Sequence, residues 1–274
     1  MNGAALELSR EHRLELARAY KFLEAVNFAT RLGELAGRPL ESALLQIPKP
    51  LRGKVERAIQ QAMLDCLKVA ARSLDGRGKL RPRPKLAAAV VGLAGGAGGA
   101  FGAAGLPFEL PFTTILMLRS IAEIARCEGE DLSKLEARLA CLEVFAYGAE
   151  RRADTGYYAS RALLSRLTTE AAARLAQRGM AGAATPAAAA LTGEVGTRFG
   201  IVVWERVAAG AVPLLGAAGA AAINVAFMSH FQKIARGHFI LRRLERLYGV
   251  EAVRDRYQLL KEADRSRRKS PEGG

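Results

Sequence analysis

Two long stretches without a charged side chain constrain the fold of this chain more than any other feature. Residues 86–108 and 207–232 contain no Asp, Glu, Lys or Arg. Each is long enough to cross a bilayer as a helix, which takes about 20 residues. Both are rich in Gly and Ala, however, and each Gly costs a helix in water about 1 kcal/mol relative to Ala. A neighbouring helix that packs directly on the small residues would offset this cost.

Two arrangements are compatible with such stretches. They could form membrane-inserting or re-entrant hairpins, or they could be the central helices of a bundle that amphipathic helices wrap. Because Gly and Ala dominate them, both stretches are only modestly apolar. We therefore favour the bundle, and we expect it to touch a membrane reversibly rather than to span it.

The glycines of the first stretch recur at the spacing of close helix contacts. Gly92 and Gly96 are four residues apart, as are Gly95 and Gly99, and such pairs let a second helix approach closely. A phosphate-binding G-x-G-x-x-G loop is excluded, because Phe101 stands where its last glycine is needed. The residues that we assign to helix packing or to facing a ligand are Gly92, Gly95, Gly96, Gly99, Gly102, Glu109, Arg119 and Asn224.

Three polar residues of that set have specific expected roles. Glu109 precedes Pro111, which we place in the first turn of a helix, so the carboxylate would lie near the positive helix end. Arg119 is expected to pair with Glu123, four residues later on the same helix. Asn224 is expected to donate a hydrogen bond between helices. An enzyme acting on lipid would instead require Glu109 and Arg119 to converge in an open cleft.

A basic segment lies immediately before the first uncharged stretch. Its five cations alternate with other residues, and its two prolines favour extended chain. Cations beside a membrane-inserting segment gain about 1 kcal/mol each at an anionic surface. Nucleic acid, which the net charge of +14 would also attract, is not an expected partner, because the segment lacks interleaved aromatic side chains. The residues assigned to the anionic membrane surface are Arg77, Lys79, Arg81, Arg83 and Lys85.

Apolar periodicity in the rest of the chain predicts an all-α fold, since no segment shows the strict alternation of a strand pair. We expect a helical bundle with two central Gly/Ala-rich helical hairpins wrapped by amphipathic helices. A single helical domain would cover residues 1–262, and residues 263–274 would be a disordered basic tail. The expected amphipathic helices span residues 9–36, 51–74, 111–127, 134–148, 156–178 and 194–211.

Two local features refine these boundaries. Ser133 and Glu136 have the spacing of a capping box at the start of the helix expected over 134–148. Residues 179–193 are low in complexity and contain a proline, which favours a flexible connection.

The sequence carries no recognisable catalytic or metal-binding constellation. Its three histidines are scattered, and no H-E-x-x-H motif or Cys/His cluster is present. The three cysteines are odd in number and lack C-x-x-C spacing, which indicates a reducing compartment. We therefore predict no catalytic residue, no metal and no cofactor.

Two long motifs resemble one known family. The segment "GGAGGAFGAAGLPFELPFTTILMLRSIAEIARCEGED" is similar to the signature region of the EcsC protein family, and "PLLGAAGAAAINVAFMSHFQKIARGHFILRRLERLYG" resembles its C-terminal region. The resemblance covers most of residues 40–250. It implies a bacterial protein linked to the membrane, because the family's namesake is encoded beside the subunits of an ABC transporter. No family catalytic residues can be carried over to this chain.

Three functions remain open from the sequence. The first is a non-enzymatic, membrane-associated accessory protein in the bacterial cytoplasm, peripheral to or partly inserted in the inner membrane, with ABC transporter subunits as possible partners. A second is a soluble helical bundle that binds a lipid or another apolar small molecule. The third is a lipid-acting enzyme.

Overall fold

The computed structural model describes residues 7–24, 28, 49–73, 106–149, 157–210 and 216–269. Within these residues the chain forms eight α-helices and one short 3₁₀ helix, with no strand, as the sequence predicts. The helices are α1 (Arg10–Leu23), α4 (Lys49–Ser73), α6 (Leu106–Cys127), α7 (Leu135–Tyr147), α8 (Tyr157–Arg178), η2 (Gly179–Ala184), α9 (Pro186–Gly210), α10 (Gly216–Tyr248) and α11 (Val250–Lys269).

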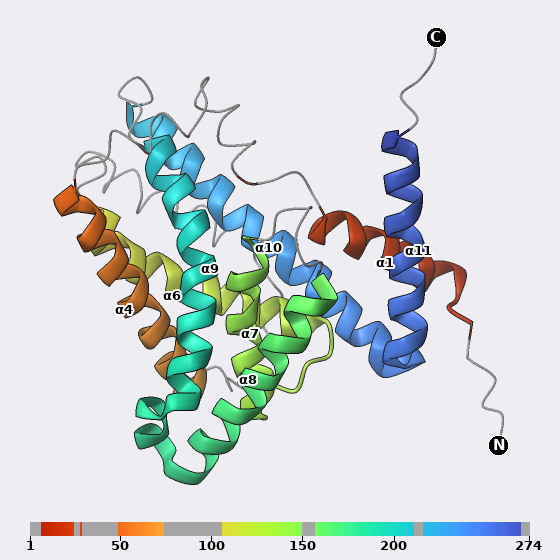
Figure 1. Cartoon of the computed structure of the whole chain (residues 1–274), viewed down its shortest axis with the longest axis horizontal. Helices are drawn as coiled ribbons and strands as arrows, with labels where there is room; N and C mark the ends of the chain where they lie inside the picture. Colours follow the sequence, from red (N-terminus) through yellow and green to blue (C-terminus); the bar gives the residue numbers. More distant parts are fainter. Residues whose placement is uncertain are drawn as a thin grey trace.

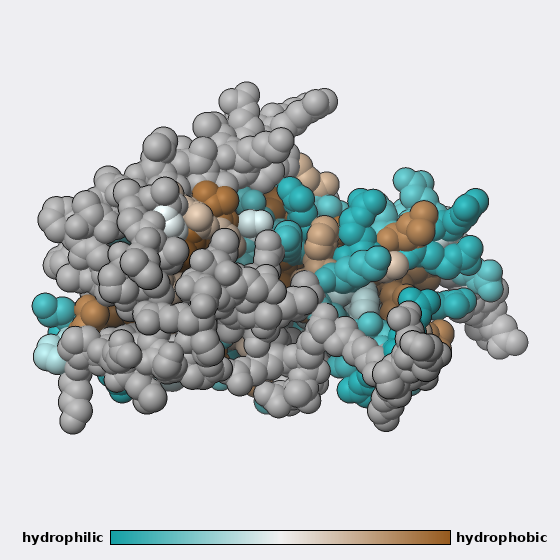
Figure 2. All heavy atoms as spheres, turned by 90° about the horizontal axis from the view of Figure 1, so that it is seen from above, coloured by the Kyte–Doolittle hydropathy of each residue, from teal (hydrophilic) through white to brown (hydrophobic). Residues whose placement is uncertain are grey.

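Helix α10 connects two parts of the molecule (Figure 1). Its 33 residues reach about 50 Å at 1.5 Å per residue. The first half packs with α6, α7 and α9 in a bundle that also contains α4 and α8, whereas α1 and α11 pack around the second half. Seen from above, hydrophilic side chains dominate the described surface at the α1 and α11 side (Figure 2). The described chain therefore has a bundle side and a charged side.

Helix α7 lies in the interior of the bundle. Every residue from Leu139 to Tyr147 is buried, and all but Glu143 are apolar or aromatic, which is typical of a helix in a core position. The described residues of the second uncharged stretch form the end of α9 and the first half of α10, where Val225 is 40% exposed. The first uncharged stretch lies outside the described residues up to position 105, so the predicted hairpin arrangement stays a prediction.

Several predicted elements are confirmed. Helices α4 and α8 match their predicted ranges closely, and the apolar stripe of α4 is buried from Val55 to Ala70. The expected start of the first helix near Ser9 is also correct, because the Ser9 hydroxyl accepts a hydrogen bond from the His12 N–H as an N-cap.

Other boundaries differ from the predictions. Helix α1 ends at Leu23, well short of residue 36. Helix α6 begins at Leu106, so Pro107 occupies the first turn and Pro111 lies inside the helix. A proline so near the start leaves only one early carbonyl without its bond, which a helix tolerates. Glu109 is therefore part of the first turn rather than ahead of the helix.

The segment expected to be a flexible connection is ordered. The 3₁₀ helix η2 occupies residues 179–184, and α9 begins at Pro186, because proline suits the first helical position and the following alanines favour helix. Helix α11 likewise continues to Lys269, through most of the tail expected to be disordered. Tyr20 reaches this part of the chain, since its hydroxyl lies 3.2 Å from the Asp264 carboxylate.

The predicted capping box is wrong. Helix α7 begins at Leu135, with Lys134 at the N-cap and no side-chain bond to the helix start. The Ser133 hydroxyl instead donates to Asp131 at 2.6 Å, and the Ser133 N–H donates to the same carboxylate at 3.0 Å. Asp131 thus binds Ser133 locally, which removes the cap that the sequence spacing suggested.

Candidate functional site

Three helices meet at a buried polar cluster formed by Glu109, Arg206 and Asn224. Arg206 Nη2 donates to Glu109 Oε1 at 2.8 Å and to Asn224 Oδ1 at 2.5 Å. Arg206 Nε also donates to Asn224 Oδ1, at 3.0 Å, and Asn224 Nδ2 donates to Glu109 Oε1 at 3.3 Å. The cluster therefore links the first turn of α6, the end of α9 and the beginning of α10.

The cluster is nearly sealed from solvent. The side chains of Arg206 and Glu109 are 4% and 13% exposed. Burial lowers the pKa of the Arg206 guanidinium, and the neighbouring Glu109 carboxylate opposes that shift. Arg206 stacks over Phe227, 5.1 Å from the ring centroid, and its Nη1 group is buried without a hydrogen-bond partner among the described residues. A paired, desolvated arginine of this kind holds its helices in one arrangement.

The cluster also joins the end of the first uncharged stretch to the described part of the second. Glu109 directly follows residues 86–108, and Arg206 directly precedes residues 207–232. Asn224 lies within the second stretch. The helix ends concerned lie together on the left of Figure 1. Sequence analysis missed Arg206, although its position immediately before an uncharged stretch could have marked it.

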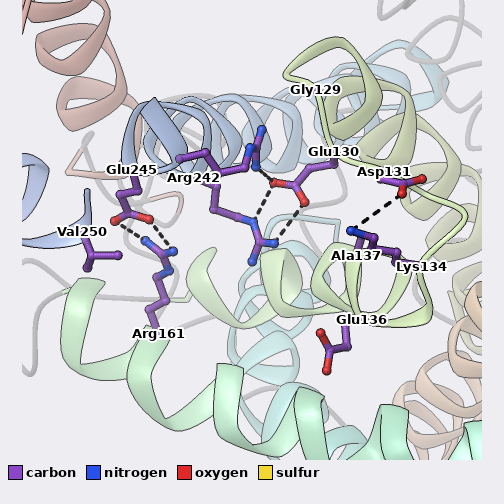
Figure 3. Close-up of a pocket in the computed structure, with 11 residues that line it drawn as sticks. Gly129, Glu130, Asp131, Lys134, Glu136, Ala137, Arg161, Arg242, Glu245 and Val250 are labelled. Carbon is purple, nitrogen blue, oxygen red and sulfur yellow. Dashed lines mark hydrogen bonds and ion pairs between the residues drawn. The ribbon is translucent and has the colours of Figure 1, made fainter. Parts of the chain in front are cut away.

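A pocket of about 490 Å³ lies near the other end of α10, between the α6–α7 turn, α7 and α8 (Figure 3). Glu130 accepts hydrogen bonds from Arg242 Nε at 2.8 Å and Nη2 at 3.0 Å, and it also accepts from Arg246. Arg161 forms a two-pronged pair with Glu245, at 2.6 and 2.5 Å. Most of the residues that line the pocket thus carry charged side chains.

The carboxylate of Glu130 is held in its charged form. Burial acts to raise its pKa, but the hydrogen bonds and charges of Arg242 and Arg246 outweigh burial and lower it. Two guanidinium groups around one carboxylate leave an excess of positive charge at this side of the pocket.

A second set of polar side chains is buried within the bundle. Glu143 accepts hydrogen bonds from the hydroxyls of Thr168 at 2.6 Å and Tyr147 at 2.7 Å, and burial raises its pKa. The Tyr157 hydroxyl lies 2.7 Å from His238 Nδ1, whereas His238 Nε2 is buried without a partner among the described residues. Burial, with the charges of nearby arginines, lowers the pKa of His238, so its ring is neutral.

Comparison with known proteins places this architecture in a family. The family model described as "EcsC protein family" matches residues 15–244, which is most of the chain. The chain belongs to the EcsC protein family. Neither a curated protein nor a solved structure matches it. The EcsC match includes the buried cluster and Arg242, whereas Glu245 and α11 lie beyond it.

Arg119 does not join Glu109 in this EcsC protein. The two residues are ten positions apart on α6, about 15 Å along the axis, and Arg119 is exposed. Within the described part of the chain no ion pair links Arg119 to Glu123, contrary to the prediction. The open cleft that a lipid-acting enzyme would need from Glu109 and Arg119 is therefore not formed by these two residues.

The remaining predicted site residues lie outside the described residues, so their roles stay predictions. They are Arg77, Lys79, Arg81, Arg83, Lys85, Gly92, Gly95, Gly96, Gly99 and Gly102.

The described residues contain no group of three or more His, Cys, Asp or Glu side chains placed to hold a metal ion. No helix among them is both long and apolar enough to cross a bilayer. The cysteines are unpaired, with Cys66 and Cys141 buried and Cys127 exposed.

Proposed function

We propose that this EcsC family protein is a non-enzymatic accessory protein that attaches reversibly to an anionic membrane surface. The contact would be made at the bundle end that carries the Glu109–Arg206–Asn224 cluster. One observation carries the proposal: the cluster joins the end of the first uncharged stretch to the start of the second. Both stretches lack charged side chains, and we expect their parts outside the described residues to enter an interface together.

The charge pattern of the segment that precedes the first uncharged stretch in the sequence supports the proposal. Five cations precede residue 86, and each would gain about 1 kcal/mol beside anionic headgroups. Such contacts weaken with salt, because mobile ions screen them within about 10 Å at 0.1 M. A surface held by cations and shallow apolar contacts would release the protein in high salt, unlike a spanning helix.

Subunits of an ABC transporter are the proposed partners at the membrane. This part of the proposal rests on what EcsC family membership implies about gene neighbourhood, and it assigns no reaction to the chain. The buried cluster would serve as the rigid base that sets the geometry of the two uncharged stretches toward membrane or partner.

Liposome flotation of the full chain tests the proposal. We expect flotation with vesicles that contain anionic lipid, weaker flotation with neutral vesicles, and release by high salt. Failure to float with either kind of vesicle would overturn it. The decisive variant replaces the basic segment with glutamine, as R77Q, K79Q, R81Q, R83Q and K85Q, and it should lose most anionic binding.

A matched control removes the same number of charges elsewhere. Five exposed arginines on α1 and α8 can be changed to glutamine with the same loss of net charge: Arg10, Arg13, Arg166, Arg174 and Arg178. This control should float almost as the unmodified chain does. Equal losses in both variants would mean that net charge, rather than the proposed end of the bundle, drives binding.

A further inference from the structure

The pocket beside α7 and α10 has a positive inner side. Three of its side chains are arginines, Arg161, Arg242 and Arg246, and two carboxylates, Glu130 and Glu245, oppose them. The inner side therefore keeps about one positive charge at neutral pH. Glu130 is only 5% exposed and Glu245 only 4%, so both carboxylates are turned into protein rather than toward the open space.

Two of these arginines keep N–H groups for a ligand. Arg242 uses Nε and Nη2 for Glu130, which leaves its Nη1 group without a partner in the described part of the chain. Arg161 uses both terminal nitrogens for Glu245, which leaves Nε. Their side chains remain 24% and 16% exposed. Groups already fixed by carboxylates are pre-organised to receive an anion through charge-assisted hydrogen bonds.

The opposite rim of the pocket is negative. Asp131 lies 4.0 Å from Lys134, a loose pair at the surface, and Glu136 is exposed with no ion-pair partner among the described residues. Figure 3 shows Arg161 and Arg242 on one side of the space and Asp131, Lys134 and Glu136 on the other. A simple anion would be attracted by the arginine side and repelled by the negative rim. A simple amine would be attracted by the rim and repelled by the arginines.

We propose that this pocket binds a small zwitterion that carries a phosphate and an ammonium group. The phosphate accepts hydrogen bonds from Arg242 and Arg161, and the ammonium group lies beside Glu136. The volume of about 490 Å³ falls in the range of small-molecule sites, about 300–1,000 Å³, and leaves room for further atoms of the ligand.

The position of the pocket favours a ligand in solution over a lipid headgroup. Arg242 follows Asn224 by eighteen residues on one continuous helix, a separation of about 27 Å along its axis. A membrane that contacts the cluster end would thus lie far from the pocket. The proposal does not depend on membrane binding, since the side chains that it uses are all described residues at the other end of α10.

Isothermal titration of the full chain with O-phosphoethanolamine tests the site, with inorganic phosphate and ethanolamine as half-ligands. We expect phosphoethanolamine to bind about tenfold more tightly than either half-ligand, because only the zwitterion satisfies both sides. The variant Glu136→Gln should weaken phosphoethanolamine about fivefold and leave phosphate binding equal or tighter. Glu170→Gln, an exposed acid on α8 away from the pocket, should change neither affinity.

Arg242→Lys is the second variant, because it keeps the charge beside Glu130 but loses the planar fork. It should weaken both phosphate and phosphoethanolamine at least tenfold, with helix content checked by circular dichroism. The proposal is overturned if phosphoethanolamine does not bind, or if phosphate binds equally well and Glu136→Gln has no effect.

Vesicles of phosphatidylethanolamine distinguish the two sources of the same chemistry. Binding of the soluble compound alone would assign the site to a free zwitterion, as we expect. Vesicle binding that Glu136→Gln weakens would support the same chemistry with a lipid as its source. If neither O-phosphoethanolamine nor the phosphatidylethanolamine vesicles bind, the proposed site is overturned. Attachment to anionic vesicles, and hence the proposed function, is tested separately and would be unaffected.

Discussion

At the Asn224 end of α10, one arginine is sealed between a carboxylate, an amide and an aromatic ring, whereas at the Arg242 end three arginines line an open pocket. Arg206 is 4% exposed and has one carboxylate partner. The pocket arginines are 16% to 43% exposed. An enclosed ion pair such as Arg206–Glu109 fixes its helices in place. The exposed arginines of the pocket, in contrast, can exchange bound water for a ligand.

The largest expected loss of stability comes from removing Glu109, the counter-charge of the enclosed Arg206. Glu109→Ala leaves the buried Arg206 guanidinium without its counter-charge, which should cost about 3–5 kcal/mol of unfolding free energy in urea titrations. Adding Arg206→Met to that variant should restore part of the loss, because no buried charge then remains. A single Glu109→Ala loss below about 1 kcal/mol would contradict the view that the cluster is structural.

A glycine at the charged side tests how closely α1 packs on α10. A Cβ at Gly237 would lie 3.0 Å from the Ala19 carbonyl oxygen and 2.8 Å from Leu23 Cγ. Gly237→Ala should therefore cost about 1–3 kcal/mol through overpacking.

The matched control for that change is Gly193→Ala on α9, where a Cβ meets nothing within 4 Å. This substitution should stabilise by up to about 1 kcal/mol, because alanine favours the helix. Equal effects of the two substitutions in thermal unfolding would mean that the α1 contact is looser than the structure shows.

Acid should weaken the fold through His238, behind the pocket. Burial holds its pKa well below 6.5 in the folded chain, so below pH 6.5 only the unfolded chain takes up the proton. The free energy of unfolding is therefore unaffected by this group above pH 6.5 and decreases as the pH falls. The loss is about 2 kcal/mol between pH 7 and 5 if the folded ring stays neutral.

The variant His238→Asn isolates that effect, because it keeps a hydrogen-bond acceptor for Tyr157 but cannot titrate. Its stability should fall less between pH 7 and 5 than that of the unmodified chain, in urea titrations at both values. Glu143 acts in the opposite sense, since its raised pKa favours the folded chain at low pH. Because the unmodified chain and the His238→Asn variant both keep Glu143, its contribution cancels when the two are compared.

The smallest effect is expected from an exposed ion pair. Arg254 contacts Glu251 on α11, and these side chains are 45% and 73% exposed. Arg254→Ala should change the unfolding free energy by less than about 0.5 kcal/mol, because solvent screens such pairs. A larger loss would contradict the view that exposed arginine pairs contribute much less to stability than the enclosed Arg206 pair does.

Apolar periodicity was sufficient to predict the all-α fold and the ranges of α4 and α8, because those helices bury one continuous face. Low complexity and a proline led to the wrong prediction for residues 179–193, where η2 forms and where alanines and a proline at the first helical position build the start of α9 instead of a linker. Loop-like composition was thus a poorer guide than helix propensity.

The candidate site was harder to predict, because its partners are far apart in sequence. Glu109 and Asn224 could be singled out by their place near uncharged segments, yet Arg206 joins them only in three dimensions. The pocket gave still less signal, since an Arg-rich helix such as the second half of α10 usually faces solvent. Only the packing of the α6–α7 turn against that helix places Arg242 in the lining of a pocket.

The pairing of α1 with α10 also delays the docking of α1 during synthesis on the ribosome. The Ser9 N–H lies 3.5 Å from the hydroxyl of Tyr248, a residue synthesised 239 positions later. At about 5–20 residues per second, the first helix waits on the order of tens of seconds for its partner. During that time Leu16, Ala19 and Tyr20, which are buried in the finished protein, have no docking surface from α10. Helix α1 is therefore open to chaperones and proteases until α10 has been synthesised.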